Sequence, residues 1–539
     1  MQISGPQGSG GASRRFATTI LQVLLVAGAL TAYHAKLLFG GSLDALDWQQ
    51  HIHFYEWIHM SLRDHGVLPL YLPPPYVTWT HSLAWLPESP VLHPLVWLLR
   101  FLGAQAYLKT LFVLYATAGV CGAYWLARTL GAARLLAALP AAIFGLQGFG
   151  LANFIIGHHW VLGVYLWPFA ALFFLRAVWG GRAATLGLAV VQSLLIVSGQ
   201  HHPAIWLVAT LGAWAVLWSV RERTFAPLRS YTAALLLTAG LSAVRILPSA
   251  YGFGAFEPPE RFSGIPAGEL LRALTTGGPI FQSGSGYLGV LVPFSWEKDA
   301  SVGILGAALL LAGLWLGRRS RESILVLVAA GALALAVDLG LPPWVVAGQR
   351  VPARLLSIVV FSCLVVAMRG LAIADDWLWG QDSRRKLRPA LLLGLCLVLI
   401  AERYSETRAW LEFGAGGPVV TRPWSPPLPR VETGEAAVTV VAVTPNRLVW
   451  DVSATQPSEL ILPLRTSQRQ LEWRIAGFPA RIHGRVVMIQ VPPGHHRVVA
   501  EFVPTAFRAG AAISVATAAA VAAYLVILRR RRRRASPAA

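Results

Sequence analysis

The chain has 539 residues, of which 55% are hydrophobic and only 13% are charged, and its mean hydropathy is +0.56. This composition excludes an ordinary soluble protein and predicts a polytopic α-helical membrane protein. The formal net charge of +20 does not indicate nucleic-acid binding, because the basic residues form short clusters between apolar runs and not one basic surface.

Apolar runs separated by polar junctions predict about twelve transmembrane helices, each of about 20 residues. The first run follows Arg14 and Arg15 and lacks the small-residue cleavage site of a signal peptide, so we expect it to be kept as a helix. The expected segments are 16–39, 106–127, 135–152, 158–177, 183–199, 203–220, 231–249, 301–317, 323–341, 352–371, 389–402 and 506–528.

Basic clusters occupy every second junction between these segments and predict the orientation of the chain. By the positive-inside rule, these junctions and both termini, including the arginine tail 529–534, face the cytoplasm. We therefore expect a multi-pass protein of the cytoplasmic (inner) membrane. The fourteen histidines then fall on or near the extracytoplasmic side.

The segment before the last expected helix differs from the rest of the chain. Residues 438–443 and 485–491 alternate apolar and polar positions, which is typical of strands, and 492–494 reads as a turn. We expect a small extracytoplasmic antiparallel β-domain that packs on the membrane domain. The predicted organisation is a transmembrane domain at 1–402 with outer loops 40–105 and 250–300, a β-domain at 403–505, and a last helix and tail at 506–539.

The first outer loop concentrates ionisable groups beside a hydrophobic segment, where such groups are costly unless paired or functional. If a helix starts at Asp47, then Asp47, His51, Tyr55 and His59 fall on one face at successive four-residue steps. A carboxylate here suits general-base chemistry, with Asp47 as the first candidate and Asp44 as the second. Either residue could instead cap the helix.

Several motifs, spread over most of the chain, resemble those of one family. They are Asp47 followed by Gly66-Val-Leu-Pro-Leu-Tyr71, Gly157-His158-His159, Ser198-Gly-Gln-His-His-Pro203, Arg350-Val-Pro-Ala-Arg354, and a carboxyl-terminal set that includes Val491-Pro-Pro-Gly494-His495. Together they resemble the YfhO-like bacterial membrane proteins, which belong to the GT-C superfamily of multi-spanning glycosyltransferases. Tyr71 departs from the family pattern, which has a tryptophan there.

The resemblance implies a GT-C-like fold and a transferase that moves a sugar from a polyprenyl-phosphate donor to a cell-envelope acceptor outside the membrane. Such a reaction needs cations to hold the leaving phosphate and donors to hold the sugar. For the phosphate we expect Arg350, Arg354 and Arg245. The candidates for substrate binding are His51, His158, His159, Gln200, His201 and His202.

Other functions remain open at this stage. Asp47 and His51, one helical turn apart, could share a divalent metal ion, although the sequence does not select a ligand set. The helices would also suit a lipid or polymer transporter or flippase. A third alternative is a non-catalytic envelope assembly protein whose β-domain binds partners.

Overall fold

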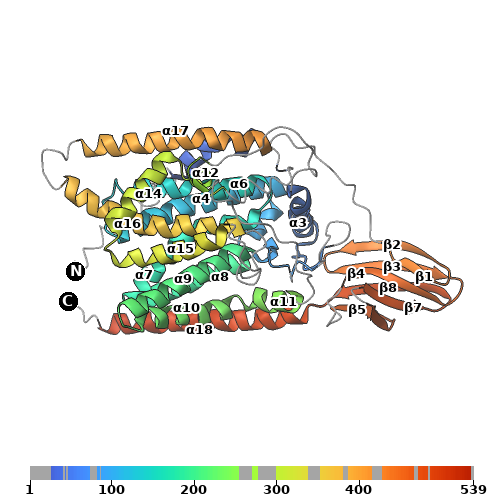
Figure 1. Cartoon of the computed structure of the whole chain (residues 1–539). Helices are drawn as coiled ribbons and strands as arrows, with labels where there is room; N and C mark the ends of the chain where they lie inside the picture. The colour runs from blue at the N-terminus through green and yellow to red at the C-terminus, as the bar shows by residue number, and fades with distance from the viewer. Residues whose placement is uncertain are drawn as a thin grey trace.

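The computed structural model describes residues 26–40, 43, 47–72, 82–84, 86–253, 270–276, 299–337, 352–379, 387–414, 428–465, 472–483 and 486–535. Most of the described chain is helical, and its long helices run side by side with a β-domain at one end (Figure 1). Site helix α3 lies at the β-domain end, and the carboxyl-terminal half of α18 lies at the other end. The longer helices are α3 (Trp48–Met60), α4 (Ala104–Thr129), α7 (Trp167–Val178), α8 (Arg182–Val197), α9 (His201–Arg221), α10 (Ala226–Leu241), α11 (Ala243–Phe253), α14 (Ile304–Gly317), α15 (Leu325–Ala336), α16 (Leu356–Trp379), α17 (Arg388–Gly414) and α18 (Thr505–Ala535).

The chain is a multi-pass membrane protein, but the expected number of twelve spans is not confirmed. Within the described ranges, 6 helices are long and apolar enough to cross a membrane, or 7 if the bent pair α10 and α11 counts as one span. Helices α14 and α15 have 14 and 12 residues, shorter than the about 20 residues that a straight span needs. Helix α17 is long enough, but Glu402 and Arg403 interrupt its apolar run.

One expected span is sharply bent, and another, although counted as one of the six, is divided into two short helices. Helices α10 and α11 meet at 76°. The expected segment 135–152 is two short helices, α5 (Ala138–Gly145) and α6 (Gly148–Ile155). After α6 the chain turns at Gly157 and enters a 3₁₀ helix, η4 (His159–Leu166), which continues into α7. A 3₁₀ run longer than three or four residues is uncommon and often marks a functional or strained segment.

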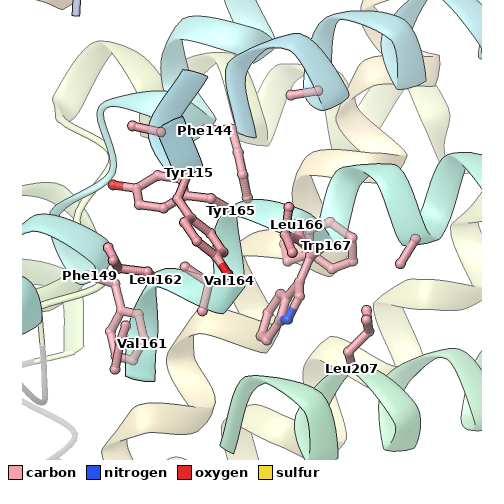
Figure 2. Close-up of a cluster of buried hydrophobic side chains, with 14 of the residues drawn as sticks. Tyr115, Phe144, Phe149, Val161, Leu162, Val164, Tyr165, Leu166, Trp167 and Leu207 are labelled. Carbon is pink, nitrogen blue, oxygen red and sulfur yellow. The ribbon is translucent and has the colours of Figure 1, made fainter. Parts of the chain in front are cut away.

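The hydrophobic core is centred on η4, whose eight residues are all buried. Figure 2 shows Val161, Leu162 and Tyr165 of this helix packed among buried side chains of neighbouring helices. Helix η4 contacts α4, α6 and α9. Its amino-terminal end therefore holds His158 and His159 at a fixed place in the bundle.

The β-domain before the last helix is confirmed. It has two four-stranded antiparallel sheets, ordered β1-β4-β7-β6 and β2-β3-β8-β5. The inward residues of both sheets form one core around Trp450. The strands are β1 (Arg430–Thr433), β2 (Ala436–Thr444), β3 (Arg447–Ala454), β4 (Ser458–Arg465), β5 (Trp473–Ala476), β6 (Ala480–His483), β7 (Val486–Val491) and β8 (Gly494–Phe502).

Tyr71, which follows the π-helical end of the α3 segment, belongs to the core of the β-domain. Its side chain is 1% exposed, and its ring meets that of Trp473 edge to face at 4.6 Å. The phenol donates to the carbonyl of Pro463 over 3.2 Å. Since the Tyr71 carbonyl also accepts from the Trp57 indole over 2.8 Å, the β-domain is joined directly to α3.

Asn446 makes a second joint beside Tyr71. Its side-chain oxygen accepts from the Leu70 amide at 2.6 Å, and its side-chain nitrogen donates to the Leu68 carbonyl at 3.2 Å. These paired bonds imitate strand pairing between the loop and the β2–β3 turn. The expected packing of the β-domain on the membrane domain is therefore present.

We predict that Tyr71→Ala loosens this junction, because a fully buried aromatic side chain is lost from a packed core. The expected cost is about 3–5 kcal/mol of local unfolding free energy. Limited proteolysis of the purified chain should then release the β-domain faster. Tyr71→Phe is the matched control, since it removes only one hydrogen bond, worth about 1 kcal/mol. Equal cleavage rates for Tyr71→Ala and the wild type would contradict this role.

Candidate active site

Two segments far apart in sequence are joined at the end of the helix bundle. The Asp47 amide donates to the Ile156 carbonyl at 2.9 Å, and the Trp48 indole donates to the Phe154 carbonyl at 2.8 Å. One turn further along α3, Nδ1 of His51 lies 2.9 Å from the carbonyl oxygen of Gly157. Buried polar groups require such partners. These bonds fix the start of α3 against the turn between α6 and η4.

Gly157 is required at this joint for two reasons. Its φ of +111° lies in a region that side chains disfavour, and a Cβ added there would lie 2.4 Å from the Trp48 amide nitrogen and 2.9 Å from the Asp47 Cβ. Only glycine allows the turn to approach Asp47 so closely. The glycine of the Gly-His motif therefore has a structural explanation.

Asp47 occupies the N-cap position of α3, but its side chain caps nothing. Oδ2 instead lies 2.8 Å from Nε2 of His158. The side chain is 49% exposed. Oδ1 has no hydrogen-bond partner in the part of the chain that the structure describes. The capping alternative is thus not what the side chain does, and one carboxylate oxygen remains for a ligand.

His158 is held between two oxygen acceptors. Nδ1 lies 2.9 Å from Oδ1 of buried Asn153, and Nε2 faces Asp47. The Asn153 amide cannot present its nitrogen to the ring, because that nitrogen donates to the Phe149 carbonyl at 2.9 Å. Both ring nitrogens therefore face oxygen atoms, which fixes the imidazole ring between Asn153 and the Asp47 carboxylate.

This pairing controls the ionisation of Asp47. Burial raises the pKa of its carboxyl group, but the hydrogen bond and charge of His158, with weaker contributions from His51 and Arg354, outweigh burial and hold the pKa below its usual value. The carboxylate is consequently ionised at neutral pH.

A second carboxylate, Glu88, lies on the other side of His51. One of its oxygens is 3.9 Å from Nε2 of His51, and its backbone carbonyl lies 3.0 Å from Nε2 of His159. The rings of His51 and His159 meet edge to face at 5.1 Å, and Tyr55 approaches His159 at 5.3 Å. The expected polar face of α3 exists, but it points into the protein.

Arg354 brings a guanidinium group to the same cluster. It lies 4.6 Å above the ring of Trp160, and its side chain is buried. The Trp160 ring also contacts two histidine rings: its centroid lies 5.0 Å from that of His158 and 4.7 Å from that of His202. His201 and His202 start α9, and their rings are 4.1 Å apart. Trp160 thus contacts Arg354 as well as His158 and His202.

Arg245 and Gln200, two of the predicted ligand-binding residues, make hydrogen bonds that hold neighbouring backbone segments. Both terminal nitrogens of buried Arg245 donate to backbone carbonyls, including those of Leu86 at 2.9 Å and Ser89 at 2.7 Å, so this residue holds the segment that carries Glu88. Gln200 accepts from the Gly163 amide of η4 at 2.8 Å. Their assignment as phosphate and substrate ligands stays a prediction.

The remaining predicted site residues fall into two groups: those that lie together in the structure and those that lie outside the described residues. The structure brings together Asp47, His51, His158, His159, His201, His202 and Arg354. Asp44 and Arg350 lie outside the described residues. Among the described residues, no group of three or more His, Cys, Asp or Glu side chains is arranged to hold a metal ion.

Sequence reasoning missed Glu88, Asn153 and Trp160. Glu88 sits in a proline-rich stretch without a helical or strand period, so its proximity to His51 had no local signal. Asn153 lies five residues before His158, and Trp160 two residues after it. Their closeness to the histidine pair was the only available indication.

Comparison with known proteins gives little support for a family. No protein-family model matches the sequence, and no curated protein matches it either. Among solved structures, the chain is similar to apo ArnT from Cupriavidus metallidurans, with 16% sequence identity, 74% of this chain and 76% of that chain covered, and a TM-score of 0.41. The sequence identity and the TM-score are both low. The function is therefore argued from the site residues, and the YfhO-like family stays an expectation.

We predict that Gly157→Ala destabilises the protein, because the added Cβ clashes with the Asp47–Trp48 backbone as well as straining φ. Gly180→Ala is the matched control: its φ is +91°, but nothing lies within 4 Å of the added Cβ. Thermal unfolding of the two variants in detergent should show the larger loss for Gly157→Ala. Equal losses would mean that the close approach has no energetic weight.

A second prediction concerns the titration of Asp47. In His158→Ala the hydrogen bond and charge of His158 disappear while burial persists, so the pKa of Asp47 should rise from its lowered wild-type value. The wild-type pair contributes stability above the unfolded-state pKa and loses it as pH falls through the lower folded-state pKa. Infrared absorption of the protonated carboxyl, taken as a difference from Asp47→Asn, measures the shift. His495→Ala, in the β-domain, should leave the titration unchanged.

Proposed function

We propose that the chain is a membrane glycosyltransferase that moves a sugar from a polyprenyl-phosphate donor to a cell-envelope acceptor. The observation that carries the proposal is the half-exposed carboxylate of Asp47, which caps no helix and is held ionised by His158. An ionised carboxylate with one unused oxygen is the group that a hydroxyl acceptor needs.

In the proposed reaction the acceptor hydroxyl donates its hydrogen bond to Oδ1 of Asp47. As its oxygen forms a bond to the anomeric carbon, the proton passes to the carboxylate. The bond between the anomeric carbon and the phosphate oxygen breaks on the opposite side, and that electron pair leaves with the polyprenyl phosphate. The anomeric configuration is inverted, because one displacement occurs.

Arg354 is proposed to bind the phosphate that leaves. A guanidinium group remains charged in a buried position and forms paired hydrogen bonds to phosphate oxygens. Its place over Trp160 brings a positive charge to the cluster, and this charge already lowers the pKa of Asp47. Arg350, two residues before Pro352, stays a second proposed phosphate ligand.

His51, His158, His159, His201 and His202 are proposed to line the sugar subsite, with His158 also fixing the carboxylate. Asp44 is kept as the alternative base and Arg245 as the support of the Glu88 segment. We place the reaction on the extracytoplasmic face of the cytoplasmic membrane with both termini inside, on the strength of the alternating basic junctions.

The proposal predicts that Asp47→Asn lowers transfer of a labelled sugar from a polyprenyl-phosphate donor by about 10²–10⁴-fold, with little change in donor KM, because general-base catalysis is lost. Asp64→Asn is the matched control, since Asp64 is exposed and pairs with Arg63. Arg354→Gln should instead raise the donor KM. Full turnover by Asp47→Asn would remove Asp47 from the proposal, and a wild type inactive with every polyprenyl-phosphate sugar would overturn the function.

A further inference from the structure

A groove of about 800 Å³ lies at the other end of the helix bundle, between α7, α8, α10 and α18. Helix α8 begins at the groove with Arg182 and ends at Val197, whose carbonyl accepts from Arg245 of the site end. A helix of 16 residues, about 24 Å long, thus separates the groove from the Asp47 cluster. The groove is independent of the proposed function.

The groove has an apolar wall and a basic rim. Leu186, Leu237 and Val521 line it along three different helices, while Arg182 and Arg229 contribute the positive charge. Its volume falls within the roughly 300–1,000 Å³ typical of small-ligand sites. An amphipathic occupant with a negative head and an apolar body fits this lining.

The two groove arginines belong to the basic junctions that orient the chain, but their guanidinium groups contact no described protein partner. Both are exposed, and neither guanidinium has an ion pair or hydrogen bond to any residue that the structure describes. Each lies in the first turns of its helix, at position one of α8 and position four of α10, where a positive charge opposes the helix dipole. Both guanidinium groups are therefore available to an anionic ligand at the mouth of the groove.

Helix α18 leaves the groove open along one side. Its middle is docked, because the Ser514 hydroxyl donates to the Gly240 carbonyl and Thr517 lies against Gly240. Beyond this point α18 continues to Ala535 (Figure 1), and none of its residues from 518 to 528 is buried. The carboxyl-terminal half of α18 carries the arginine run 529–534, so a further set of positive charges lies on the same helix.

We propose that this groove binds one anionic phospholipid of the surrounding leaflet. The lipid phosphate lies between Arg182 and Arg229, and an acyl chain fills the apolar wall between α10 and α18. Charge complementarity selects the lipid, since basic pockets between transmembrane helices bind anionic head groups. The bound lipid replaces the protein contacts that α18 lacks beyond Thr517.

The test is native mass spectrometry of the full purified chain, delipidated and titrated with phosphatidylglycerol or with phosphatidylcholine of the same acyl chains. We expect one phosphatidylglycerol per chain, with affinity at least tenfold above that for phosphatidylcholine. Arg182→Gln/Arg229→Gln should lose this preference. The control Arg134→Gln/Arg319→Gln removes the same charge from exposed arginines outside the groove and should keep it.

A second pair of variants tests the groove itself. Ala520→Trp places a large ring in the groove, whereas Ala518→Trp places it on another exposed position of α18 that does not line it. Only Ala520→Trp should abolish binding. Equal affinity for both lipids, equal loss in both arginine pairs, or displacement of the lipid by inorganic phosphate would overturn the proposal.

Discussion

The ion pair between Asp47 and His158 is the interaction on which the site depends. The two residues are 111 positions apart, and a carboxylate at the edge of a membrane domain is too costly to desolvate unless it is paired. The pair forms because α3 is tied by backbone and indole hydrogen bonds to the turn after α6. Gly157 in turn permits that contact, because a side chain at this position would clash with Asp47 and Trp48. The position of the Asp47 carboxylate therefore depends on glycine at position 157.

The cluster around this pair has more potential positive groups than negative ones. Asp47 and Glu88 lie near His51, His158 and Arg354, and the aromatic rings of Trp160 and Tyr55, which belong to the hydrophobic core, pack against the histidines. Such an excess suits an anionic ligand, because a cluster of positive groups attracts negative charge. Burial of Arg354 strengthens this effect, since screening by water is weaker there.

The sequence predicted the membrane class and the β-domain, since each has a strong local signal, and it directed attention to Asp47, whose catalytic role stays a prediction. Pairing could not be predicted: Asp47 was matched with His51 one turn away, whereas its partner is His158. Arg245 was selected by residue type alone, and its hydrogen bonds to the carbonyls of Leu86 and Ser89 follow from the chain path after the 76° bend, which no local pattern reveals. Hydropathy predicted twelve spans, of which the described residues show six or seven, because it measures apolarity without detecting where a helix ends.

Tyr71 has a consequence for the order of assembly. Its hydroxyl acceptor, Pro463, lies 392 positions later in the chain, so the tyrosine is synthesised long before the strands that enclose it. Closing so long a separation costs chain entropy before any contact rewards it. The β-domain therefore completes its core only on a membrane domain that already presents this side chain, and α3 is secured from both ends when translation of the strands is over.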